Sequence, residues 1–246
     1  MKLNSPAVGR LERIRRRLEE LPPLPKRLLL IRPRYRRDRF TTSGSYEWAE
    51  RVKAKAIAEG WEVEDLSSQR ANRALTEQAL SRIAVERPRL VMHYDHGSEY
   101  TLYGHPRSRR PDAIEQGWVP VIDETNIALC AGTFVSAVAC SSAAGLGPLA
   151  VADGATGYLG YSEPLVCGWL DSNVERFGEA ANAANYALLE GKSPIEALVI
   201  GKRAWNELHS RLIGGAGPST GPFDIEWWDI AVTLWNRDCL TLLQPR

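Results

Sequence analysis

The sequence predicts an α/β fold, a three-layer α/β/α sandwich around a mostly parallel sheet of about six strands. Short apolar runs recur along the chain, and such runs are typical of strands that helices cover on both faces. Segments with helical spacing of apolar residues separate the first of these runs. This alternation of strand and helix favours parallel strands joined by right-handed crossovers.

The first half of the chain predicts three strands and two helices. Leu28–Ile31 is an all-apolar run and predicts the first strand. Residues 41–45 supply capping side chains for a helix that runs to about residue 60. Residues 61–66 alternate and predict a second strand, residues 75–86 have helical spacing, and Leu90–Tyr94 predicts a third strand.

The second half begins with a stretch, residues 99–134, that is rich in Gly, Pro and Arg and predicts a connection of loops with a short helix. The elements expected after it are a strand at 135–139, a helix at 146–153, a glycine-containing strand at 155–161, helices at 173–190, 194–212 and about 225–235, and a last strand at 239–243.

Composition indicates one large domain with a basic arm. The chain has 246 residues, of which 44% are hydrophobic, so it can bury a substantial core. Residues 1–40 carry a net charge of +9 and the remaining residues −8. We therefore predict an arm at 1–25, with a basic amphipathic helix at 6–20, and a domain at 26–246. Such an arm can contact nucleic acid, although no nucleic-acid motif accompanies it.

The sequence lacks a membrane span, a secretory signal and a C-x-x-C pair, and these features predict the location of the protein. No apolar run reaches the roughly 18 to 20 residues of a membrane span, and the first residues lack the apolar core of a secretory signal. The four cysteines form no C-x-x-C pair, so reduced thiols are expected. These features predict a cytoplasmic protein without a metal or cofactor, and they leave the oligomeric state open.

Two residues with catalytic chemistry follow two of the apolar runs. His96 comes shortly after the third predicted strand, and Cys140 directly follows the fourth. The carboxyl ends of parallel strands meet at one edge of a sheet. A thiol with a pKa near ~8.5 needs a base to become a nucleophile at neutral pH, and His96 can supply it. The backbone N–H groups of Gly97 and Cys140 would then form an oxyanion hole.

The dipeptides His96-Gly97 and Ala139-Cys140, each behind an apolar strand and with the histidine first, resemble the His-Gly and Ala-Cys blocks of caspase-fold cysteine peptidases. The similarity extends from Val135 to Tyr161 and is closest to the bacterial gingipain and CHAT-like branch. The resemblance implies a caspase-like sheet and a His–Cys dyad that hydrolyses peptide or protein substrates. It implies no catalytic carboxylate.

Other assignments compete with this one. His93 is an alternative base, but it lies inside the third strand rather than at its end. Asp95 should lie on the opposite side from His96 if the strand alternation continues, which favours a structural role. A second reading is a catalytically silent caspase-like module that binds a protein or nucleic acid through the arm. A hydrolase with another nucleophile would need a G-x-S-x-G elbow between a strand and a helix, and the match at residues 217–221 lies instead in the predicted loop between two helices.

Substrate preference is the least determined property. In related clostripain-like enzymes an acidic residue two before the cysteine favours a basic P1 side chain, and here that position is Val138. Asp123, Glu124 or Glu163 can provide a carboxylate from a loop, and Trp169 can line the substrate pocket. The loop Arg107–Arg110 is the expected site of proteolytic nicking.

Overall fold

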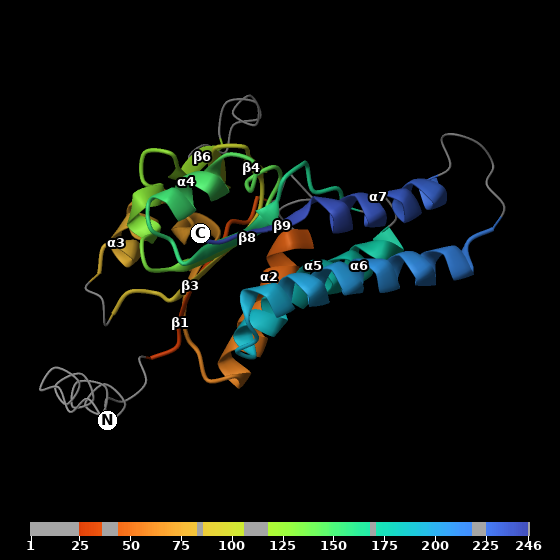
Figure 1. Ribbon diagram of the computed structural model, residues 1–246, viewed down its shortest axis with the longest axis horizontal. Helices are drawn as coiled ribbons and strands as arrows, with labels where there is room; N and C mark the ends of the chain where they lie inside the picture. Colours follow the sequence, from red (N-terminus) through yellow and green to blue (C-terminus); the bar gives the residue numbers. More distant parts are fainter. Residues whose placement is uncertain are drawn as a thin grey trace, which may run out of the picture.

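The computed structural model describes residues 25–35, 44–82, 86–105, 118–167, 171–217 and 225–245. It is a three-layer α/β/α sandwich, as the sequence predicts (Figure 1). Three expectations fall outside these residues: the arm helix at 6–20, the loop Arg107–Arg110, and Trp169.

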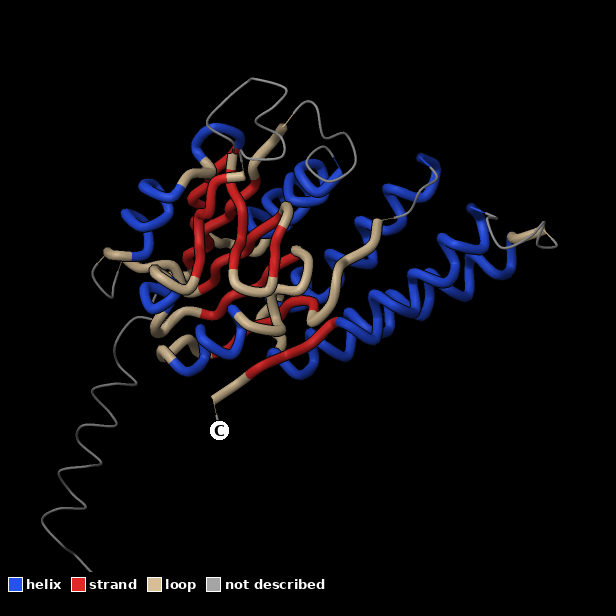
Figure 2. Tube along the Cα trace, turned by 90° about the horizontal axis from the view of Figure 1, so that it is seen from above, coloured by secondary structure: helices blue, strands red, loops and turns tan. Residues whose placement is uncertain are grey.

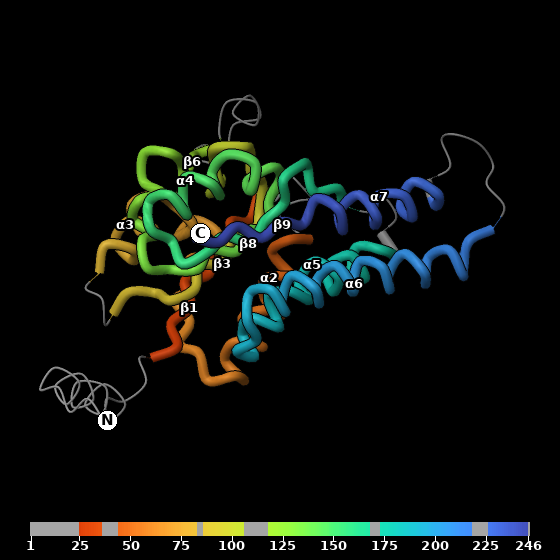
Figure 3. Tube along the Cα trace, viewed as in Figure 1, coloured from red at the N-terminus to blue at the C-terminus, as the bar shows by residue number. Residues whose placement is uncertain are grey.

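The central sheet has six strands in the order β2-β1-β3-β7-β8-β9. The first five strands pair in parallel, and only β9 runs antiparallel, beside β8. This pairing places the C-terminal strand against a strand from the middle of the chain (Figure 3). The strands are β1 (Arg27–Arg32), β2 (Glu62–Ser67), β3 (Leu90–Tyr94), β7 (Phe134–Val138), β8 (Gly157–Tyr161) and β9 (Leu240–Leu243).

Helices cover both faces of the sheet. Alternate residues of each strand point to opposite sides, so each face contributes to its own hydrophobic core. Leu28 and Leu30 belong to one hydrophobic core, and Leu29 and Ile31 belong to the other. The first core packs under α2 (Gly44–Ala58), α5 (Asp171–Leu189) and α6 (Pro194–Gly215). The second packs under α3 (Arg73–Leu80) and α4 (Leu146–Ala152). Figure 2 shows helices on both sides of the strands.

A small antiparallel sheet replaces the loops expected between residues 99 and 134. It consists of β4 (Gly97–Ser98), β5 (Thr101–Gly104) and β6 (Val119–Asp123), and a 3₁₀ helix, η4 (Ile127–Cys130), follows it. The prediction of an irregular connection was therefore wrong in this part. The strands are two to five residues long and lie in a stretch rich in Gly, Pro and Arg, a composition that indicates loops.

The remaining elements agree with the sequence apart from their limits. The helix expected at 75–86 ends at Leu80, and a short 3₁₀ helix, η2 (Ser68–Arg70), lies just before it. Ser193 and Glu196 form a capping box at the start of α6. The last helix, α7 (Ile225–Cys239), runs alongside α6, and both extend past the sheet (Figure 1). In the described ranges no helix has the length and apolar character needed to cross a bilayer.

Candidate active site at the carboxyl edge of the sheet

Strands β3 and β7 are neighbours and bring His96 and Cys140 to the same edge. They pair in parallel with Leu90 opposite Phe134 and Tyr94 opposite Val138. His96 lies two residues beyond the end of β3, and Cys140 lies two residues beyond the end of β7. The two residues that the sequence selects for their chemistry therefore follow adjacent strands at the same distance from the strand ends.

The close approach of the two segments requires glycine at position 97. A Cβ atom placed on Gly97 would lie 2.9 Å from the Cβ of Ala139 and 2.9 Å from the carbonyl oxygen of Cys140. Real Cβ atoms hardly ever come this close to other heavy atoms. The His-Gly and Ala-Cys dipeptides are thus in direct backbone contact, and the two small residues make that contact possible.

The hairpin that follows His96 holds the segment after Cys140 at a second point. The backbone N–H of Leu146 donates to the carbonyl of Glu99 at 2.7 Å. A Cβ on Gly145 would lie 2.6 Å from the ring of Tyr100, so the hairpin turn packs against the start of α4. These contacts fix the β4–β5 hairpin and the Cys140 turn relative to each other.

The backbone pattern of the hairpin leaves the amide of Gly97 out of the β4–β5 ladder. The N–H of Tyr103 donates to the carbonyl of His96 at 3.2 Å, so these two residues form a hydrogen-bonded pair. Gly97 is opposite Leu102 in the next pair. Because hydrogen-bonded and non-bonded pairs alternate in an antiparallel ladder, the Gly97 amide points away from β5. An oxyanion hole needs an amide that is not already used in this way.

His96 and Cys140 line one pocket at this edge, with a volume of about 30 Å³. The lining residues come from α2, the turn after β3, the end of β7 with the turn after it, and the segment after β8. The full lining set is Ser45, Trp48, Asp95, His96, Val138, Ala139, Cys140, Leu165 and Cys167.

The Cys140 thiol is half-buried and donates a hydrogen bond to the carbonyl oxygen of Leu165, with Sγ and O 3.6 Å apart. Burial raises the pKa of the thiol above its ordinary value; hydrogen bonding with the backbone at Leu165 and at Cys140 itself offsets part of the rise, and the carboxylate of Asp95 adds to it. Because its pKa is raised, the resting thiol is neutral at pH 7.

Ser141, the next residue, has a φ of +54°, a left-handed conformation that turns the chain sharply after the cysteine.

The imidazole of His96 packs against an aromatic ring. Its centroid lies 3.3 Å from a ring centroid of Trp118, which is the residue before β6. Trp118 also meets Tyr103 edge to face at 5.4 Å. The small sheet that the sequence does not predict thus supports the histidine, and Trp118 is one of the site residues that the sequence reasoning missed.

The structure locates Asp95 and His93, two other ionisable residues that the sequence places near His96. Asp95 and His96 both line the pocket, in the turn that follows the end of β3 at Tyr94. The opposite orientation of their two side chains stays a prediction. His93 is fully buried, and its Nε2 is 2.7 Å from the carbonyl of Tyr103. The residues that line the pocket do not include His93.

Of the predicted substrate-pocket residues, three can be located, and one of them, Glu124, is exposed in the turn after β6 and does not line the pocket. Asp123 is at the end of β6, where its carboxylate binds Arg73 at 2.7 Å and accepts hydrogen bonds from Thr125. It does not line the pocket, because it is held by these partners on the small sheet. Glu163 is exposed, and its backbone carbonyl accepts the N–H of Ser141 at 3.0 Å, so it is beside the site without lining the pocket. Trp169 lies outside the described residues.

Leu165 and Cys167 are site residues that sequence reasoning missed. They are on the segment that follows β8, and the sequence there has neither alternation nor a motif. The only signal was the position itself, since a loop after a parallel strand opens on the same edge as His96 and Cys140. Trp48 of α2 also lines the pocket, and its helical spacing indicated only a core position.

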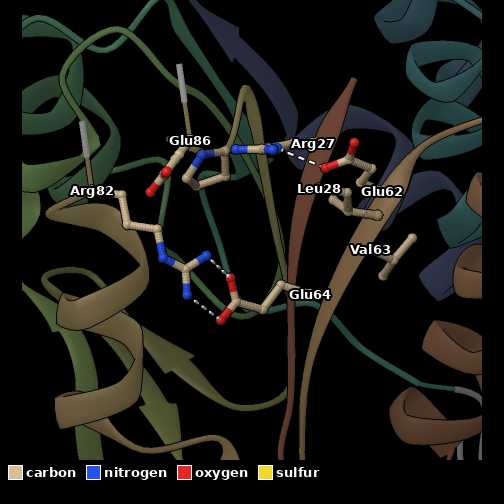
Figure 4. A pocket seen from close by; sticks show the side chains of 8 residues that line it. Arg27, Leu28, Glu62, Val63, Glu64, Arg82 and Glu86 are labelled. Atoms are coloured by element: carbon tan, nitrogen blue, oxygen red, sulfur yellow. Dashed lines mark hydrogen bonds and ion pairs between the residues drawn. The ribbon is translucent and has the colours of Figure 1, made fainter. Parts of the chain in front are cut away.

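A wider pocket lies at the opposite edge of the sheet, near the amino ends of β1 and β2 (Figure 4). Its volume is about 350 Å³. Four of its five charged lining side chains form two ion pairs: Arg27 with Glu62 at 2.7 Å, and Arg82 with both oxygens of Glu64 (Figure 4). The pocket is therefore a groove between ion pairs and is remote from His96 and Cys140.

We predict that Gly97→Ala destabilises the fold and separates the two segments. The added methyl group must displace Ala139 or the Cys140 carbonyl, and overpacking of this kind costs about 1–3 kcal/mol. Urea unfolding of the full chain measures the change. Gly214→Ala is the matched control, because nothing lies within 4 Å of the position where its Cβ would be. Equal free energies of unfolding for the two variants would contradict the packing described here.

Compared with known proteins, the chain matches no family model and no curated protein.

Proposed function

We propose that the chain is a cysteine peptidase that hydrolyses peptide bonds through His96 and Cys140. One observation carries the proposal: Gly97 is packed against the backbone of Ala139 and Cys140 at the carboxyl edge of two adjacent parallel strands. This is the arrangement expected if the His-Gly and Ala-Cys dipeptides are the two halves of a dyad. The resemblance to caspase-fold peptidases of the gingipain and CHAT-like branch points to the same chemistry.

In the proposed mechanism, His96 removes the proton from the Cys140 thiol as the thiol attacks the scissile carbonyl carbon. The amides of Gly97 and Cys140 donate to the oxyanion that forms. The protonated imidazole then gives its proton to the leaving amine, and an acyl-enzyme remains on Cys140. Water, deprotonated by His96, attacks the acyl-enzyme and releases the second product.

The substrate is proposed to be a peptide or protein, and the P1 preference is left unassigned. Val138 lines the pocket where related enzymes carry an acidic residue that selects basic side chains. We propose the cytoplasm as the location, because the cysteines have no C-x-x-C spacing and all four are free thiols.

A peptidyl electrophile that reacts with thiols, such as an acyloxymethyl ketone pool with varied P1 residues, tests the proposal. We expect labelling of Cys140 in the native chain and none at this position in Cys140→Ala, with the site found by mass spectrometry. Cys130 is a control within the same molecule, because it is fully buried and burial raises its pKa to about 12. The peptidase proposal is rejected if Cys140 is labelled no faster than glutathione, an exposed-thiol standard, and if the labelling rate does not depend on the P1 residue.

A catalytically silent module is the second candidate, and a specific observation favours it. The Cys140 thiol has a raised pKa and already contacts the Leu165 carbonyl, in a pocket of about 30 Å³. In this alternative, the basic arm would bind a nucleic acid or a protein, but residues 1–24 lie outside the described part of the chain. The peptidyl electrophile separates the two candidates, since a silent module has no P1-dependent labelling.

A further inference from the structure

The segment Ser162–Cys167, here called the strap, leaves β8 and passes directly beside the proposed nucleophile. The N–H of Ser141 donates to the carbonyl of Glu163 at 3.0 Å, and the Cys140 thiol donates to the carbonyl of Leu165 at 3.6 Å. Leu165 and Cys167 line the pocket together with Cys140, and Val166 between them does not. This alternation indicates an extended strap with one face toward the pocket.

The other side of the strap is held by α7. The side-chain amide of Asn236 donates to the carbonyl of Val166 at 2.7 Å and accepts the N–H of Val166 at 3.0 Å. The indole N–H of Trp235 donates to the carbonyl of Pro164 at 2.8 Å, and the N–H of Ser162 donates to the carbonyl of Cys239 at 2.9 Å. One helix end therefore binds the strap at three successive alternate residues.

The Asn236 contact is the strongest of these because both backbone groups of one residue are bound by one side chain. Asn236 has no exposed surface. The strap lies outside the strands of the sheet, so Val166 has no ladder partner, and the amide of Asn236 takes the place of one. Removing it leaves the N–H and the C=O of Val166 without this partner in a partly buried position, which favours opening of the segment.

We propose that Asn236 is a latch that holds the strap closed over Cys140, and that access to the thiol requires the strap to separate from α7. In the closed state the thiol is held against the Leu165 carbonyl, and Leu165 and Cys167 of the strap line the pocket beside it. Asn236 is thus a positioning residue that acts through the strap. The idea that a peptide enters when the strap opens rests on the proposed function, whereas control of the thiol does not.

Alkylation of the full chain with iodoacetamide tests the latch. We expect Asn236→Ala to raise the alkylation rate of Cys140 by about thirtyfold, because two hydrogen bonds worth roughly 1 kcal/mol each are lost. Cys130 reports global unfolding in the same molecules, because it is fully buried on the other side of the sheet. Faster alkylation of Cys140 with Cys130 still protected supports the latch. An unchanged Cys140 rate in a chain that protects Cys130 overturns it.

A milder pair of variants decides the matter if Asn236→Ala unfolds the chain. Trp235→Phe removes the hydrogen bond to Pro164 and keeps most of the ring, and Trp235 is 45% exposed. Trp228→Phe is the matched control, since Trp228 is on the same helix and 51% exposed. We expect about threefold faster alkylation of Cys140 in Trp235→Phe alone. Equal rates in both variants and the native chain overturn the proposal.

The alkylation result is independent of peptidase activity. Iodoacetamide needs no P1 recognition and no oxyanion hole, so the latch can be present in a chain that fails the peptidyl-electrophile test. Conversely, P1-dependent labelling of Cys140 together with no effect of Asn236→Ala would keep the proposed function and reject the latch.

Discussion

His96→Ala is expected to lower kcat/KM for peptide hydrolysis by about a thousandfold. A positioned general base contributes about 10² to 10⁴ in rate, and Cys140 depends on it strongly because burial raises the pKa of the thiol. Without the imidazole, water must accept the thiol proton and no group is left to protonate the leaving amine. The measurement uses a pool of fluorogenic peptides with varied P1 residues, hydrolysed by the full chain.

The double variant His96→Ala/Cys140→Ala shows whether the two residues act as a unit. Residues of one catalytic unit have strongly non-additive effects, so the double variant should be no less active than Cys140→Ala. His209→Ala is the control, because His209 is on α6 and bonds to the Ile230 carbonyl and the Thr233 hydroxyl of α7. Full activity in His96→Ala would contradict the roles proposed for His96 and Cys140. A loss of activity in His209→Ala as large as that in His96→Ala would contradict them as well.

The central strands of the large sheet were predictable because helices cover them on both faces. Residues such as Leu28–Ile31 must then be apolar on both faces, and that pattern is visible in the sequence. The small sheet was not predictable for the opposite reason. Its strands are short and partly exposed, and pairing such as Thr101 with Asp123 depends on a connection of which residues 106–117 are not described.

The site was predictable only as far as local sequence encodes it. His96 and Cys140 follow their strands directly, so the topology alone brings them together. The contribution of Gly97 could be expected as a backbone donor, but its packing against Ala139 is a tertiary contact. The closed strap depends on Asn236, 70 residues from Val166, and no local pattern reports a contact of that separation.

Acid should destabilise the chain from about pH 6.5 downward, and His93 is the expected cause. Burial lowers the pKa of His93 from 6.5 to about 4; the hydrogen bond to the Tyr103 carbonyl opposes this shift and the nearby His96 adds to it. Between pH 6.5 and 4 the unfolded chain binds a proton at this position and the folded chain does not. Stability is therefore complete above pH 6.5 and falls with the pH by about 3 kcal/mol across this window.

The variant His93→Gln isolates this contribution. Gln can still donate to the Tyr103 carbonyl but does not titrate, so its free energy of unfolding should stay nearly level from pH 6.5 to about 4.5. Below that pH, both proteins lose stability as carboxylates with lowered pKa values become protonated, such as Asp65 beside Arg32 and Lys53. Urea unfolding at half-unit pH steps measures the two curves, with His209→Gln as the control for loss of a histidine. The predicted difference is in the slope of the unfolding free energy against pH, so a general loss of stability in His93→Gln does not imitate it. Parallel curves for the two proteins would show that His93 is accessible to protons in the folded chain.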